Sequence, residues 1–124
     1  MGNEETLFPY FDIMESTRQH KIARLIQKDL SDIFLSYTRS MHGALISVSE
    51  VRVSSDLSIA HVYLSIFPTD RQQEIMEFVE KEHRHIRGEM GNRERFQLRI
   101  IPELFFHLDQ TIDRMEHIEQ LLKQ

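Results

Sequence analysis

"MHGALISVSEVRVSSDLSIAHVYLSIFP", residues 41–68, contains the alternation that decides the fold. In its second half apolar residues occupy every other position: Ala60, Val62, Leu64 and Ile66. An apolar residue at every second position predicts a β-strand with one buried face. Pro68 should end this strand, because proline has no N–H group to donate to the sheet.

The first half of the same stretch predicts a second strand with an irregularity. Ile46 and Val48 share one parity, whereas Val51 and Val53 share the other. A change of parity within one strand indicates a β-bulge, which we expect near Ser49 and Glu50. The residues between the two strands, "SSDLS" at 54–58, are typical of a turn. The stretch therefore predicts a hairpin.

Two helical patterns flank the hairpin. Before it, Ser16 and Gln19 have the spacing of a capping box, and apolar residues recur at helical spacing up to Phe34. After it, residues 69–91 predict a second helix in which Thr69 and Gln72 repeat the capping-box spacing. Its turn at 81–85 has no apolar residue, so we expect a kink or an exposed turn there. Gly91 and Asn92 are typical of a helix end.

A third strand and a last helix complete the pattern. In "RFQLRIIPELFF", residues 95–106, Phe96, Leu98 and Ile100 alternate with polar residues, and Pro102 ends or interrupts the strand. Residues 109–123 predict a short amphipathic helix. The sequence thus predicts an α+β protein of order α-β-β-α(kinked)-β-α, with a three-stranded sheet and helices on one face. A strand, helix, strand order implies a right-handed crossover.

The length and the charge distribution indicate one domain with an acidic extension. The chain has 124 residues and a formal net charge of −5, and this length fits a single domain. Residues 1–15 contain four acids and no base, whereas residues 16–108 contain 13 bases and 12 acids. We therefore divide the chain into an acidic tail, 1–15, whose composition is compatible with disorder, and a folded domain, 16–124.

The composition argues against several classes of protein. The absence of cysteine excludes disulfides and thiolate chemistry, and the sequence has no nucleophile elbow, phosphate loop or dinucleotide motif. His83 and His85 would point about 200° apart on a helix, so we expect no metal site. We also expect no cofactor, no small-molecule substrate and no enzymatic activity. No apolar run reaches the roughly 18 residues of a membrane helix and no secretion signal is present, so we expect a cytoplasmic protein.

Positive charge is concentrated in one stretch. Five arginines lie between residues 84 and 99, although the whole chain has only 15 lysines and arginines. The same stretch contains "GEMG", residues 88–91, which matches the Gly-x-x-Gly loop that KH domains use to hold an RNA backbone. Glu89 would repel phosphate, however, and Gly91 already serves as the predicted helix end. This pattern alone is therefore a weak sign of RNA binding.

Four stretches of the chain stand out together, in this order: "STRQHKIARLIQKDLSDIF", "VRVSSDLSIAHVYLSIF", "HIRGEM" and "LRIIPELFFHLD". They resemble the motifs of the ribosome-binding factor A family, whose members are bacterial assembly factors for the small ribosomal subunit, and the resemblance covers about residues 16–122. The resemblance implies a KH-like fold of the bacterial type and binding to small-subunit rRNA. It also implies a role in late maturation, in 5′-end processing of that rRNA and in growth at low temperature, by a protein that is monomeric when free and is not an enzyme.

The sequence departs from the family pattern at the expected helix break. The small-residue-x-Gly break of the family aligns with residues 82–84, where Arg84 replaces the glycine. The kink should therefore arise without glycine, because this turn has nothing to bury. The segment between Arg87 and Leu98 is also about two residues longer than the family pattern.

The resemblance implies that the basic residues bind RNA, because arginine pairs with phosphate and stacks on bases. We predict an RNA-binding patch made of nine residues: Arg18, Lys21, Arg24, Lys28, Arg84, Arg87, Arg93, Arg95 and Arg99. Alternatives stay open, because the bases of the first helix could form a solvated face and Arg87 could pair with Glu103. The competing function is a KH-like protein-interaction module without direct RNA binding. An enzyme would instead require a pocket with converging polar groups.

Overall fold

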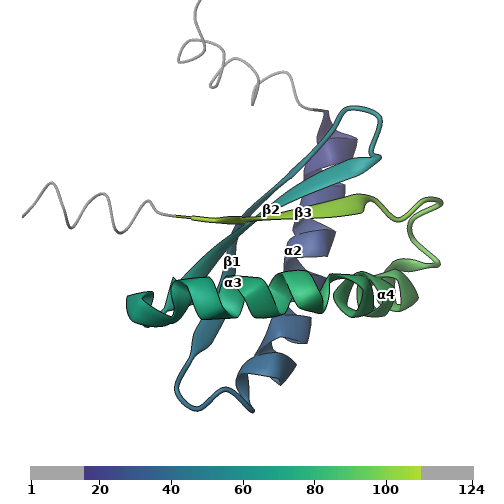
Figure 1. Ribbon diagram of the computed structural model, residues 1–124. Coiled ribbons are helices and arrows are strands. Elements are labelled where there is room, and N and C mark those ends of the chain that lie inside the picture. Colours follow the sequence, from purple (N-terminus) through teal and green to yellow (C-terminus); the bar gives the residue numbers. More distant parts are fainter. Residues whose placement is uncertain (1–15, 110–124) are drawn as a thin grey trace, which may run out of the picture.

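The computed structural model describes residues 16–109 and shows a three-stranded sheet with three α-helices (Figure 1). The elements in chain order are α2 (Thr17–Thr38), β1 (Leu45–Val53), β2 (Ile59–Phe67), the 3-10 helix η1 (Thr69–Arg71), α3 (Gln72–Lys81), α4 (His83–Glu94) and β3 (Glu103–Leu108). The predicted α+β class and three-stranded sheet are confirmed. The predicted tail, 1–15, lies outside the described residues, as does nearly all of the last helix predicted at 109–123.

The sheet has the order β1-β2-β3. Strands β1 and β2 form the predicted antiparallel hairpin, and their register shifts between Val48 and Glu50, so the predicted bulge is confirmed. Strand β2 ends at Phe67, directly before Pro68, as expected. Strands β2 and β3 are parallel, which agrees with a helical crossover between them.

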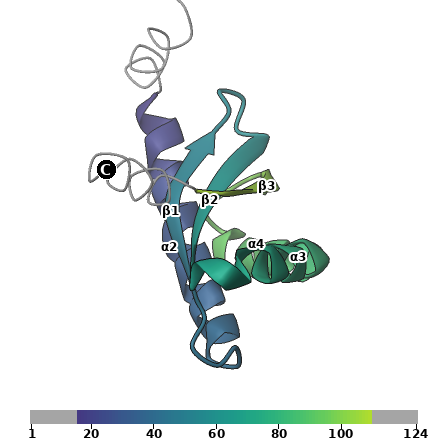
Figure 2. The same ribbon diagram turned by 60° about the vertical axis from the view of Figure 1, so that its left-hand side comes forward.

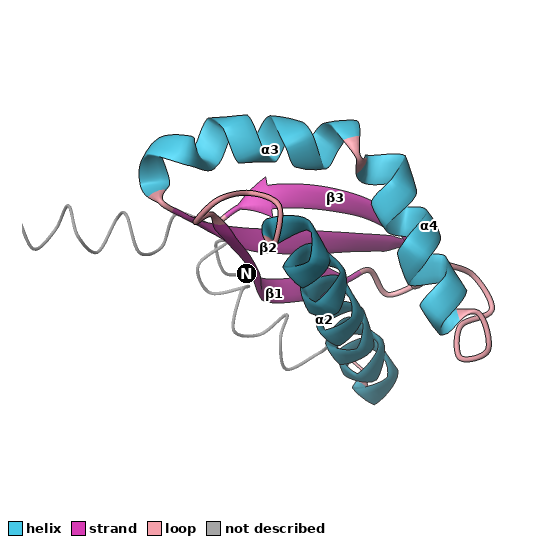
Figure 3. Cartoon of the chain, turned by 90° about the horizontal axis from the view of Figure 1, so that it is seen from below, coloured by secondary structure: helices cyan, strands magenta, loops and turns pink. Residues whose placement is uncertain are grey.

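The helices cover one face of the sheet. Figure 2 shows α2 beside β1, and Figure 3 shows α3 next to β3 with α4 continuing from it at an angle. The buried side chains of the three strands all lie on the face that the helices cover: Ile46, Val48, Val51, Val53, Ala60, Val62, Leu64, Ile66, Leu104 and Phe106. Within residues 16–109 the opposite face has no helix over it. It presents a row of rings, because Phe105 and His107 of β3 lie against His61 and Tyr63 of β2.

Helix α2 begins as predicted. The backbone N–H of Gln19 donates to Ser16 Oγ at 3.1 Å, and that of Ser16 donates to Gln19 Oε1 at 2.9 Å, which is the capping box. The Gln19 amide also donates to the buried carbonyl of Val53 at 2.9 Å. One residue thus caps the helix and holds it against β1.

The second helical region is divided at the predicted place. Glu82, with φ −92° and ψ 9°, separates α3 from α4. No side chain between Val79 and Ile86 is buried, so the apolar stripe that keeps a helix on the sheet is interrupted there. The expected position of the kink is therefore confirmed, and no glycine occurs in the turn.

Both predicted ends of this helical region are wrong. Thr69 does not cap a helix, because residues 69–71 form a 3-10 turn whose N-cap is Pro68, without a side-chain cap. Helix α4 continues past Gly91 to Glu94, because Met90 and Glu94 extend the buried side that begins at Ile86. Gly88 and Gly91 are consequently helical, and the Gly-x-x-Gly loop does not exist here.

The third strand shares only the last four residues of its predicted range, 95–106, and continues to Leu108. Strand β3 starts after Pro102, at Glu103, which pairs with Ile59 at the start of β2. The chain before Ile59 is the hairpin turn, so residues 95–101 have no strand beside them to pair with. The exposed fractions of Phe96 and Ile100 are 86% and 70%, although the alternation had predicted a buried face.

Candidate nucleic-acid interface

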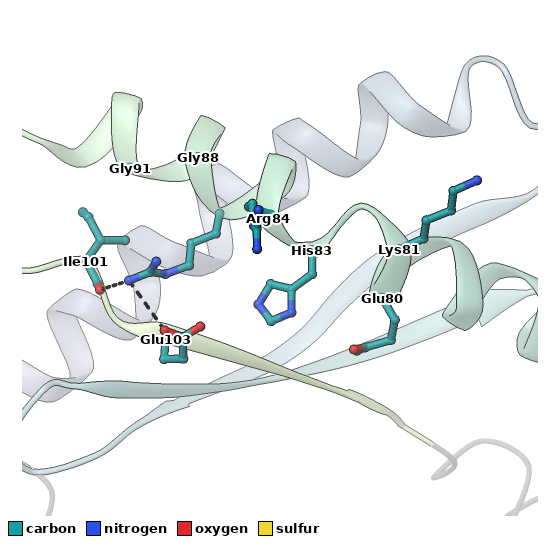
Figure 4. Close-up of a pocket in the computed structure, with 9 residues that line it drawn as sticks. Glu80, Lys81, His83, Arg84, Gly88, Gly91, Ile101 and Glu103 are labelled. Carbon is teal, nitrogen blue, oxygen red and sulfur yellow. Dashed lines mark hydrogen bonds and ion pairs between the residues drawn. The ribbon is translucent and has the colours of Figure 1, made fainter.

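A groove of about 870 Å³ follows the joint between α3 and α4 (Figure 4). The described residues that line it are Glu80, Lys81, His83, Arg84, Arg87, Gly88, Gly91, Ile101 and Glu103. The groove exists because the chain bends at Glu82 and because the segment after α4 returns beside the helix before β3. None of these lining residues is a serine, threonine or cysteine, so the groove has no hydroxyl or thiol nucleophile.

Two of the bases in the groove are available to a ligand. Lys81 and Arg84 are exposed and have no ion-pair partner among residues 16–109. Lys81 is also the last residue of α3, where a positive charge is stabilised by the negative end of the helix dipole. Both side chains can therefore contact an anion without first breaking an interaction within the described domain.

His83 also lines the groove, with its side chain partly buried. Its Nε2 is buried and has no hydrogen-bond partner in the described part of the chain. Its ring packs edge-on against Phe106 of β3, with 5.4 Å between the ring centroids. Because this nitrogen is buried, it is not open to a ligand in the groove.

Arg87 holds the groove wall in place. Its Nε donates to the carbonyl of Pro102 at 2.9 Å and one terminal nitrogen donates to the carbonyl of Ile101 at 2.7 Å. The same nitrogen lies 3.9 Å from a carboxylate oxygen of Glu103, so the anticipated pairing with that residue is present. The guanidinium thus fastens the chain that leads into β3 to the first half of α4.

Replacing Arg87 should therefore weaken the fold. We expect Arg87→Ala to lower the free energy of unfolding by about 2 kcal/mol, because two charged hydrogen bonds to backbone carbonyls are lost. Arg87→Lys should recover only part of this, since an ammonium group lacks the planar fork of the guanidinium. Urea unfolding followed by circular dichroism measures the difference. Arg84→Ala is the matched control and should change stability by less than about 0.5 kcal/mol; equal stabilities for all variants would contradict the anchoring role.

The other predicted patch residues do not all meet in this groove. Arg18 and Arg99 come together at a second, smaller pocket between the start of α2 and the segment before β3. Arg93 lies 3.5 Å from Asp32 of α2, and the Arg95 guanidinium lies 4.7 Å from the centre of the Phe96 ring. On α2, the remaining three bases are exposed away from the groove: Lys21, Arg24 and Lys28.

The groove includes two residues that the sequence prediction missed, Lys81 and His83. The signal that could have identified them is the turn without apolar residues, 81–85. Polar residues at a helix joint line whatever groove the joint creates, because they are not needed in the core.

A buried pair of carboxyl groups lies where α4 ends against α2. Glu94 is fully buried, Asp29 is 9% exposed, and neither oxygen of the Glu94 carboxyl has a hydrogen-bond donor among the described residues. Burial, followed by a hydrogen bond with Asp29 and repulsion from its charge, raises the pKa of Glu94 to about 8. The Glu94 carboxyl therefore stays protonated near neutral pH and donates a hydrogen bond to Asp29.

Residues 16–109 contain neither a candidate metal site nor a helix that could span a membrane. No group of three or more histidine, aspartate or glutamate side chains there could hold a metal ion. None of the described helices has both the length and the apolar character to cross a membrane.

The fold and the groove define a small α+β protein with a basic groove at a helix joint. The chain belongs to the ribosome-binding factor A family, whose model matches residues 18–122. The Ribosome-binding factor A of Christiangramia forsetii is 44% identical over 111 residues, which cover 88% of this chain and 85% of that protein. The resemblance inferred from the four motifs is thereby confirmed.

Solved structures of the family show the same fold. The crystal structure of ribosome-binding factor A from Thermus thermophilus matches with a TM-score of 0.61 and 19% identity, over 73% of this chain and 94% of that one. The coordinates of a homology model of the Thermus thermophilus protein, as fitted into a cryo-EM map of its 30S complex, match with a TM-score of 0.54 and 22% identity, over 68% of this chain and 88% of that one. At these identities the likeness extends to the fold alone.

Proposed function

We propose that this protein binds the small ribosomal subunit by holding rRNA in the groove between α3 and α4. The observation that supports this most is the pair of exposed bases without partners in the described domain, Lys81 and Arg84, at the helix joint of a chain in this family. The Thermus protein whose coordinates were fitted into a 30S complex supports the choice of the small subunit.

The electrostatics of the groove suit a phosphate backbone. The negative charge of Glu103 is paired with the positive charge of Arg87. The remaining charged side chains of the groove lining are Lys81 and Arg84, which are positive, and Glu80, which is negative. Most hydrogen bonds to a nucleic acid reach phosphate and sugar atoms, and lysine and arginine donate many of them. A groove of this kind positions an RNA strand without reading its sequence.

The biological role that we propose follows from the family. The protein is a KH-like assembly factor of the cytoplasm that acts in late maturation of the small subunit and in 5′-end processing of its rRNA, and supports growth at low temperature. It is a monomer when free, has no catalytic activity and needs no cofactor.

Sedimentation with purified ribosomal subunits tests this function. We expect the protein to pellet with small subunits at low salt, to pellet less at moderate salt, and to stay in the supernatant with large subunits. Binding that involves phosphate contacts weakens with salt because counterions are released. Failure to bind either subunit, or equal binding to both, would contradict the proposal.

A protein-interaction module without direct RNA binding is the second candidate. It is favoured by the uncovered sheet face, where Leu45, Phe67 and Phe105 are 50%, 64% and 46% exposed. Exposed apolar side chains of this size are common in protein contacts. This candidate predicts binding to small subunits that barely responds to salt.

A further inference from the structure

We propose that residues 95–101, here called the arginine loop, form a second RNA contact in which Phe96 stacks on an unpaired base. This inference rests on the proposed function and extends it, because it concerns a surface outside the groove. Phe96 is exposed in the structure, although its sequence pattern predicts a buried face.

The ring of Phe96 has no role in the described core. It is 86% exposed, more than any other large apolar side chain described, and Ile100 is 70% exposed on the same loop. Leu98 between them points inward and packs against the core. The loop is therefore oriented, with one apolar side chain turned in and two turned out.

The loop is held at both ends. After α4, the backbone N–H groups of Gln97 and Leu98 both donate to the carbonyl of Glu94, at 2.8 and 2.9 Å. Before β3, Arg87 donates to the carbonyls of Ile101 and Pro102. A loop fixed in this way presents Phe96 with little conformational entropy left to lose on binding.

The charge around Phe96 favours RNA over a protein. The stretch 91–102 contains Arg93, Arg95 and Arg99, all exposed, and its one acid is the buried Glu94. Glu94 is buried and does not reach the surface, whereas Arg93 lies 3.5 Å from Asp32. Arg95 and Arg99 are therefore the two charges of this stretch without an ion-pair partner among residues 16–109. An exposed ring close in sequence to two arginines without an ion pair in the described domain matches a ligand that has both π faces and phosphates.

The geometry of the ring also suits base stacking. The Arg95 guanidinium lies 4.7 Å from the ring centre, so it covers one face, and the high exposure leaves the other face open. Single-stranded RNA is recognised by stacking unpaired bases on aromatic side chains, with arginine adding a cation–π contribution. Phe96 and Arg95 together provide such a platform.

The loop is continuous with the groove and with the second, smaller pocket, whose charged lining residues are Arg18, Arg99 and Asp56. Ile101 lines the groove, whereas Arg99 and Ile100 line the pocket that also contains Arg18. A strand that leaves the groove over Ile101 would therefore meet the arginine loop next. This placement gives Arg18 and Arg99, which lie outside the groove, a common role beside Phe96.

Three variants test the inference. Phe96→Leu removes the ring but keeps an apolar side chain, Phe96→Trp keeps an aromatic face, and Phe67→Leu is the matched control, because Phe67 is also exposed but lies on the uncovered sheet face. Affinity is measured by equilibrium titration with purified small subunits and, separately, with a single-stranded and a fully paired RNA oligonucleotide. Tryptophan fluorescence reports stacking directly, since the chain has no other tryptophan.

We expect Phe96→Leu to weaken binding to small subunits and to the single strand about 10-fold, a typical loss for one stacked base. Phe96→Trp should keep the affinity, and its fluorescence should change with the single strand but not with the duplex. Phe67→Leu should bind like the wild type. Because Phe96 is so exposed, circular dichroism should show all variants folded.

The contrary outcomes separate this inference from the proposed function. Wild-type affinity for Phe96→Leu, in a protein whose groove variants lose binding, would overturn the arginine loop and leave the groove intact. If Phe96→Leu and Phe96→Trp lose affinity equally, base stacking is overturned and the contact is with a ribosomal protein. The same conclusion holds if Phe96→Leu loses affinity only for subunits and the fluorescence of Phe96→Trp does not respond to the single strand. Failure of the wild type to bind small subunits would overturn both proposals.

Discussion

A chain with Lys81→Glu and Arg84→Glu should bind small ribosomal subunits about 100-fold more weakly than the wild type. Each reversal replaces a favourable phosphate contact with repulsion, and a tenfold loss per residue corresponds to about 1.4 kcal/mol. Both side chains are exposed and have no ion-pair partner in the described domain, so their loss leaves no unpaired buried group. Equilibrium titration with a labelled protein measures the change, and circular dichroism confirms the fold.

The matched control is Lys28→Glu with Arg39→Glu. It reverses the same number of charges at exposed positions on or next to α2 that do not line the groove. We expect less than a threefold effect. Equal losses in the two double variants would show that overall charge, and not the groove, determines binding. A loss confined to the control would instead support the original prediction that the bases of α2 bind RNA.

The free energy of unfolding should fall as the pH rises from about 5 to 8, and Glu94→Gln should remove most of that fall. Burial raises the pKa of Glu94 to about 8 in the folded protein, above its ordinary value of 4.5. In this pH range the folded state keeps a proton that the unfolded state releases, so stability is lost as the pH increases. The shift corresponds to an effect on the order of 4 kcal/mol at pH 8.

Glutamine imitates the protonated carboxyl at every pH and can still donate to Asp29. At pH 8 the Glu94→Gln protein should be more stable than the wild type by a few kcal/mol, and at pH 5 the two should be close. Urea unfolding at pH 5, 6.5 and 8 gives the comparison, with the exposed Glu77→Gln as a control. A constant difference between wild type and Glu94→Gln across this range would show that Glu94 is ionised in the folded protein.

Local patterns predicted the parts of the fold that depend on local chemistry. The capping box at Ser16, the bulge at Val48 and Glu50, and the end of β2 before Pro68 each follow from a few neighbouring residues. The kink at Glu82 followed from the absence of anything to bury in that turn.

Tertiary contacts decided the parts that local patterns did not predict. Gly91 is a good helix end in isolation, but burial of Met90 and Glu94 continues the helix beyond it. Residues 95–101 alternate like a strand, yet the hairpin ends before it could pair with them. The interaction of Glu94 with Asp29 is likewise invisible in sequence, because the two carboxyl groups are 65 positions apart.

The candidate site was predicted in part. The sequence predicted basic residues at the helix joint but not which of them stabilise the fold and which are available to a ligand. That distinction depends on which carbonyls and carboxylates lie near each side chain. Arg87 anchors the chain before β3, Arg93 lies beside Asp32, and Arg84 remains available to a ligand. Lys81 was overlooked since one lysine in a polar turn has no distinctive pattern.

The salt dependence of small-subunit binding, measured for the wild type and for the Lys81→Glu, Arg84→Glu protein, tests the groove most directly. The logarithm of the affinity falls linearly with the logarithm of the salt concentration, by about 0.7 to 0.9 for each phosphate contact. If both residues contact rRNA, the slope of the variant should be shallower than that of the wild type by about 1.5. Equal slopes, whatever the change in affinity, would contradict the claim that this groove binds the RNA backbone.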